Sequence, residues 1–127
     1  AGNLFWHDGA PGLLDWQLVR TGEGVGDVAY LLGTALLPDD RRAAERALLE
    51  RYRDALAREG VAAALEPAAL FDRYRAHLTY AFEAMVVTLA VGGLMADDVA
   101  RELARRAAVA VADVDAFAAV EDRPAGA

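Results

Sequence analysis

The feature that most limits the fold is a series of long segments whose apolar residues recur at helical intervals. Residues 41–59, 67–91 and 99–120 each carry such a stripe, about one helix face wide. Glycine or proline stands between them, and a shorter apolar run over residues 28–32 precedes them. The sequence therefore predicts a mainly α fold with an antiparallel helical bundle over residues 27–120. The positions expected to face the core of the long helices are Ala44, Leu48, Tyr52, Leu56, Phe71, Tyr74, Leu78, Phe82, Met85, Leu89, Val99, Leu103, Ala107, Val111, Val114 and Phe117.

A small β-hairpin over residues 3–17 is expected ahead of the helices. Leu4–His7 and Leu13–Gln17 are predicted to be its strands, and Asp8–Gly12 is predicted to be a loop of about five residues. Asp-Gly favours such a turn because both residues accept a positive φ. At the other end of the chain, residues 121–127 are polar, contain Pro and Gly, and are expected to form a flexible tail.

Composition excludes several classes of function. The formal net charge of −7 argues against nucleic-acid binding, which needs a basic face, and weakens the case for docking on anionic membranes. The absence of cysteine excludes disulfides, thiolate chemistry and zinc fingers, and is consistent with the cytoplasm. The longest apolar stretch, residues 84–96, is too short to span a bilayer. The chain opens directly on the hairpin pattern, so we expect a piece of a longer protein.

Asn3 and Asp15 are the residues whose placement most suggests chemistry. Asn3 precedes the first predicted strand and Asp15 lies in the second, so the hairpin would bring their side chains to about 5 Å across the pair. One amide oxygen and one carboxylate at that range can hold Mg²⁺, which takes few protein ligands and leaves the rest to phosphate and water. The alternative, an edge Asn and a loop Asp without a ligand, stays open on spacing alone.

The glycine-dense segment Thr21–Gly26 follows the hairpin. It lacks the Gly-Lys-Ser/Thr of a phosphate-binding loop and the spacing and context of a dinucleotide fingerprint. We expect a flexible connector, with Asp27 as the N-cap of the next helix. Arg20 is expected to pair with Glu23 or Asp27, and His77 to be an ordinary, partly buried helix residue.

Three motifs in the first third of the chain resemble a known family in order and spacing. They are Gly2-Asn3-Leu4-Phe5-Trp6, Gly12-Leu13-Leu14-Asp15-Trp16-Gln17 and Gly24-Val25-Gly26-Asp27-Val28-Ala29-Tyr30-Leu31-Leu32. Together they resemble the aminoglycoside phosphotransferase/choline kinase-like superfamily, and most of all its ecdysteroid-kinase-like branch. The resemblance implies the C-terminal helical lobe of a protein-kinase-like α+β fold, with ATP and Mg²⁺ as cofactors.

The resemblance also implies roles for single residues. Asn3 and Asp15 match the two Mg²⁺ ligands, and Asp27 matches an acid that anchors the catalytic loop. Trp16 and Gln17, which follow the metal-binding Asp, are candidates for lining the nucleotide or acceptor cleft, although Trp16 could instead pack under the hairpin. The catalytic Asp of the family would lie five residues before the Asn, upstream of Ala1, as would the N-terminal lobe.

The resemblance implies that the chain is part of an ATP-dependent phosphotransferase that moves the γ-phosphate to the hydroxyl of a small-molecule acceptor. The isolated chain is expected to be inactive because it lacks the catalytic base. The alternative is a non-catalytic helical binding module derived from a degenerate kinase lobe. The acceptor and the oligomeric state are left open.

Overall fold

The computed structural model describes residues 3–16, 19, 21–61 and 66–121. These residues form a mainly helical structure with one two-stranded antiparallel hairpin, as predicted. The elements are β1 (Leu4–His7), β2 (Ala10–Leu13), α1 (Val25–Ala35), α2 (Pro38–Arg58), α3 (Pro67–Val91), α4 (Asp97–Asp113) and α5 (Ala116–Glu121).

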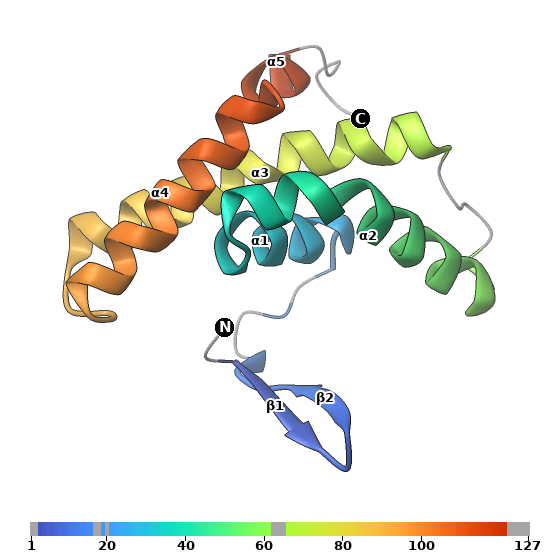
Figure 1. Ribbon diagram of the computed structural model, residues 1–127, viewed down its shortest axis with the longest axis horizontal. Coiled ribbons are helices and arrows are strands. Elements are labelled where there is room, and N and C mark those ends of the chain that lie inside the picture. Colours follow the sequence, from blue (N-terminus) through green and yellow to red (C-terminus); the bar gives the residue numbers. More distant parts are fainter. Residues whose placement is uncertain (1–2, 17–18, 20, 62–65, 122–127) are drawn as a thin grey trace.

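Helix α3 is the central element of the bundle. It packs against α1, α4 and α5, and α2 completes the bundle against α1 and α3. The hairpin stands apart from the helices at one end of the molecule (Figure 1). Pro67 begins α3 and Gly92, with a φ of 70°, follows its last residue, as the sequence predicts. Within the described ranges, no helix is both long and apolar enough to cross a membrane.

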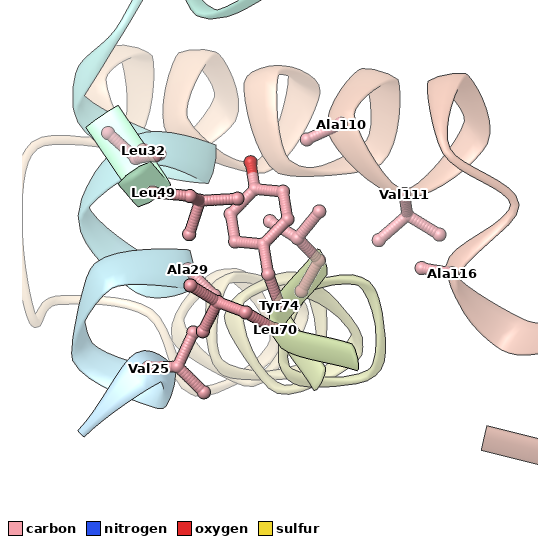
Figure 2. Packing of buried hydrophobic residues seen from close by; sticks show 10 residues of the cluster. Val25, Ala29, Leu32, Leu49, Leu70, Tyr74, Ala110, Val111 and Ala116 are labelled. Carbon is pink, nitrogen blue, oxygen red and sulfur yellow. The ribbon is translucent and has the colours of Figure 1, made fainter. Parts of the chain in front are cut away.

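The core gathers around Tyr74 and Leu78 of α3, which are fully buried. Figure 2 shows the Tyr74 ring among side chains from α1, α2 and α4. Alanines form much of the buried face of α4, which lets that helix approach α3 closely. Those alanines are Ala100, Ala104, Ala107 and Ala110. The alanine-rich composition therefore has a packing role in this helix.

The hairpin loop is shorter than predicted. His7 pairs directly with Ala10, so the connection is the two residues Asp8 and Gly9, not the five residues 8–12. Both have positive φ, 48° and 79°, which is the backbone of a tight turn whose twist matches that of the strands. The predicted second strand, Leu13–Gln17, was wrong because Pro11 and Gly12 were treated as loop residues. Pro11 is accommodated in β2 because that strand is an exposed edge.

The last predicted helix is divided in two. The sequence predicts one helix over residues 99–120, but α4 ends at Asp113 and α5 begins at Ala116, with Asp115 at a φ of 49°. Arg75 of α3 donates to the carbonyl oxygens of Val114 (2.6 Å) and Asp115 (2.9 Å). A cation at the end of α4 satisfies carbonyls that lose their helical partners there, which stabilises the break.

The predicted core positions were wrong at three sites. Leu89, Val99 and Phe117 are exposed, and Phe117 retains 53% of its accessible surface. The break before α5 turns Phe117 away from the direction that an unbroken helix would give it. Leu89 and Val99 lie near the α3–α4 connection, where fewer helices are available to cover them.

The buried face of α2 is centred on charged residues. The predicted apolar stripe at Ala44, Leu48, Tyr52 and Leu56 is only half-buried, whereas Arg41, Glu45 and Leu49 are buried. The Arg41 guanidinium pairs with the carboxylates of Glu45 and Asp113. The Tyr74 hydroxyl donates to Glu45 at 3.1 Å, and burial raises the pKa of Tyr74 well above its usual range. The charges are thus paired within the core, as buried charges must be.

Because of this network, the free energy of unfolding depends on pH under acidic conditions. Hydrogen bonds from Arg42 and the charges of Arg41 and Arg42 lower the pKa of Asp113, against the opposing effect of burial. The unfolded chain therefore binds a proton at a higher pH than the folded chain, so this part of the stability is present above about pH 4 and is lost as the pH falls further. We expect Asp113→Asn to flatten the pH dependence of the free energy of unfolding below pH 4, measured by urea denaturation. Parallel curves for the two proteins would contradict this.

Candidate metal site on the hairpin

The hairpin brings Asn3 and Asp15 together. The Leu14 amide donates to the Asn3 carbonyl at 2.9 Å, which extends the strand pairing by one residue. The Asn3 Nδ2 then donates to Asp15 Oδ2 at 3.1 Å. The predicted approach of the two side chains is confirmed, although the shorter turn places Leu14, and not Asp15, directly opposite Asn3.

Asp15 has an unusual backbone for a residue that follows a strand. Its φ is 66°, a left-handed conformation that Asp and Asn tolerate better than other non-glycine residues. The Trp16 indole Nε1 donates to the Leu13 carbonyl at 3.1 Å and closes the turn around Asp15. The chain therefore leaves the strand sharply at Asp15, and its carboxylate is turned toward Asn3 rather than along the strand.

The donor set fits a magnesium ion. If the side-chain amide of Asn3 flipped, its oxygen would take the position that its NH₂ group now occupies. Asn3 and Asp15 could then both present hard oxygen ligands. Among the described residues, no group of three His, Asp or Glu side chains is placed to hold a metal. From the part of the chain that the structure describes, the ion would receive this amide and this carboxylate, which is compatible with an ion that fills its other positions with phosphate and water.

Trp16 is available for contact with a ligand. Its side chain is 60% exposed, so it does not pack under the hairpin, which was the alternative for this residue. Its role beside a nucleotide or acceptor stays a prediction. Gln17, the other residue predicted to line that cleft, lies outside the described residues.

Asp27 is not the N-cap of α1. The helix begins at Val25 after Gly24, which places Asp27 at its third residue. The side chain is exposed, and an acid in the first turn still interacts favourably with the positive end of the helix. Sequence reasoning missed the earlier start because glycines occupy the cap and the second helical position. Its predicted role as an anchor of the catalytic loop is untested.

Glu23 is an organising residue that the sequence did not reveal. Arg73 Nη1 donates to its carboxylate at 2.5 Å, and His77 Nε2 lies 2.8 Å from its other oxygen. Segment 21–26 was expected to be a flexible connector, but Glu23 ties it to α3. Arg20, its predicted partner, lies outside the described residues. No local signal could have identified Arg73 and His77, which lie 50 or more positions away along the chain.

A comparison with protein families gives the chain its context. The model of a family described as "Uncharacterized oxidoreductase dhs-27" matches residues 2–112. The chain belongs to this family. The family is part of the ecdysteroid/choline kinase-like group, in agreement with the resemblance of the three motifs. No curated protein and no solved structure matches the chain.

Proposed function

We propose that the chain is part of the C-terminal lobe of an ATP-dependent small-molecule phosphotransferase, in which Asn3 and Asp15 bind the Mg²⁺ that accompanies ATP. The observation that carries the proposal is the 3.1 Å contact between these two side chains across the hairpin. Membership of a kinase-like group supports it. The acceptor would be the hydroxyl group of a small molecule, and the compartment the cytoplasm.

Each residue would act by position and charge. The Asp15 carboxylate would be the anionic ligand of the metal and the Asn3 amide oxygen its neutral partner. When bound, Mg²⁺ would offset the negative charge of the ATP phosphates and help to orient them. Trp16 would present its exposed indole to the nucleotide or the acceptor. Asp27 would hold the backbone of the catalytic loop, to which Asn3 would belong.

The family description names an oxidoreductase, which is a different chemistry. Hydride transfer from a dinucleotide would call for a glycine fingerprint between a strand and a helix. The glycines of residues 22–26 do not have that spacing, and the strand that precedes them among the described residues ends at Leu13. The exposed Asn–Asp pair favours phosphoryl transfer instead.

The two tryptophans provide a direct test of the metal site. Trp6 and Trp16 are the only ones in the chain, so its tryptophan fluorescence reports on the hairpin region. In a Trp6→Phe variant, Mn²⁺ is expected to quench the emission of Trp16, which adjoins Asp15, and Mg²⁺ is expected to compete. Trp16→Phe retains Trp6, which pairs with Pro11 close to the turn, and should respond less. Equal quenching in the two variants, without competition by Mg²⁺, would contradict the proposal.

The isolated chain should not catalyse phosphoryl transfer. Metal ligands alone supply neither the base that accepts the hydroxyl proton nor the site that positions the triphosphate. We expect no formation of ADP above background when the 127-residue chain is incubated with Mg²⁺-ATP and amino-sugar or amino-alcohol acceptors. Acceptor-dependent turnover would contradict this prediction, because it would show that this chain itself contains a catalytic base and a site for the triphosphate.

A further inference from the structure

We propose that Glu23, Arg73 and His77 form a clamp that holds the first turn of α1 against α3 and thereby positions Asp27. The assignment of Asp27 as an anchor rests on the proposed function, whereas the clamp itself does not. Glu23 acts in this proposal as a positioning residue that does not touch a substrate.

The contacts of Glu23 join parts of the chain that are far apart in sequence. Its two carboxylate oxygens are shared between Arg73 Nη1 and His77 Nε2, one helical turn apart on the same face of α3. The Glu23 backbone carbonyl accepts from the Gly26 amide at 2.9 Å. Glu23 thus links α3 by its side chain to the first turn of α1 by its backbone.

The glycines beside Glu23 explain why a clamp is needed. A Cβ at Gly24 would lie 2.7 Å from the Tyr52 hydroxyl oxygen, and a Cβ at Gly26 would lie 3.2 Å from His77 Nδ1. Glycine therefore permits the close approach of this segment to α2 and α3. However, glycine is a poor helix former with a large backbone entropy, so the first turn would fray without an external tether.

Asp27 depends on that turn for its position. It lies in the first turn of α1, and its side chain makes no hydrogen bond or ion pair with another described residue. Tyr52 of α2 reports on the charge of Asp27, because the pKa of Tyr52 is raised by burial and by the charges of Asp27 and Glu23. A fixed first turn therefore keeps an exposed carboxylate in a constant place, as an anchor for another chain segment requires.

Amide exchange in the 127-residue chain tests the clamp. By helix geometry, the amides of Ala29 and Tyr30 donate to carbonyls of the first turn of α1. We expect Glu23→Ala to speed their exchange about tenfold, the effect of losing a charged hydrogen bond, with a smaller effect for Glu23→Gln. Exchange at the buried Ala107 of α4 should not change. The matched control is Asp72→Ala, which removes an exposed carboxylate that bonds to Arg75 on α3. Equal effects of Glu23→Ala and Asp72→Ala at Ala29 and Tyr30 would overturn the proposal.

The titration of Tyr52 tests whether Glu23 positions Asp27. Asp27→Asn is expected to lower the pKa of Tyr52 in the otherwise unchanged protein, because it removes a nearby negative charge. In a Glu23→Ala background, where Asp27 is already released, the same substitution should lower it much less. An equal decrease in both backgrounds, measured by NMR of the Tyr52 ring, would show that Asp27 holds its position without Glu23. Because neither experiment uses a metal or ATP, failure here is distinct from failure of the proposed function.

Discussion

Asp15→Asn is expected to weaken the binding of Mn²⁺ or Mg²⁺ to the hairpin by at least about tenfold, since even the loss of a group that only orients a metal ligand costs about 10- to 100-fold in affinity. Asp15 supplies the only carboxylate of the Asn3–Asp15 pair, and a hard divalent cation needs that negative charge. Asn retains the size of the side chain and tolerates the positive φ of this position. The substitution therefore removes the charge while leaving the hairpin intact. Affinity is measured by the quenching of Trp16 in the Trp6→Phe background.

Asp8 offers a matched control for this substitution. It is an exposed aspartate of the same hairpin, also at positive φ, and it lies at the turn, away from the Asn3–Asp15 pair. Asp8→Asn should leave the metal affinity within about twofold, because removing an exposed charge has a small effect at a distance. If both variants lost the same affinity, the binding would reflect general acidity of the chain, and the site assignment would be wrong.

Arg41→Met is expected to destabilise the fold by about 3–5 kcal/mol, the usual cost of breaking a buried ion pair. Arg41 is 1% exposed and pairs with both Glu45 and Asp113. Its removal would leave Glu45 in the core with the Tyr74 hydroxyl as its remaining partner among the described residues. Met fills a similar volume, so the loss would report the uncompensated charge rather than a cavity. The measurement is the free energy of unfolding in urea at pH 7.

Substitution of the neighbouring Arg42 distinguishes the effect of burying an arginine from the effect of pairing it with Asp113. It also bonds to Asp113, at 2.7 and 3.0 Å, but its side chain is 46% exposed. Arg42→Met should therefore destabilise the protein much less than Arg41→Met does, as is typical of exposed pairs. If the two substitutions destabilised the protein equally, the network would act through the charge of Asp113 alone, and burial of Arg41 would not matter.

The candidate site could be predicted from the sequence because it is local. Asn3 and Asp15 are brought together by one hairpin, because Asn3 pairs with Leu14 and the positive φ of the next residue, Asp15, turns its carboxylate back toward Asn3. An error in the turn, two residues instead of five, left this pair in place. The existence of the long helices was equally local, since apolar periodicity and Pro or Gly boundaries lie within each segment.

The sequence-based predictions failed where the structure depends on contacts between residues that lie far apart in the sequence. The break between α4 and α5 is stabilised by Arg75, which lies on α3. Glu23, just before α1, contacts Arg73 and His77 of α3, and the glycines beside it lie close to side chains of α2 and α3. Periodicity counts apolar residues, so it also missed the buried face of α2 at Arg41 and Glu45.

The sequence by itself determined the helical segments, the hairpin and the meeting of Asn3 with Asp15, because each depends on backbone preference and spacing within a short stretch. Only the tertiary structure decided that a charged network fills part of the core and that Glu23 fastens the segment between the hairpin and the bundle. The physical reason is that a charge can be buried, or a glycine-rich turn held still, only by a partner, and these partners come from helices that lie distant in the chain and adjacent in space.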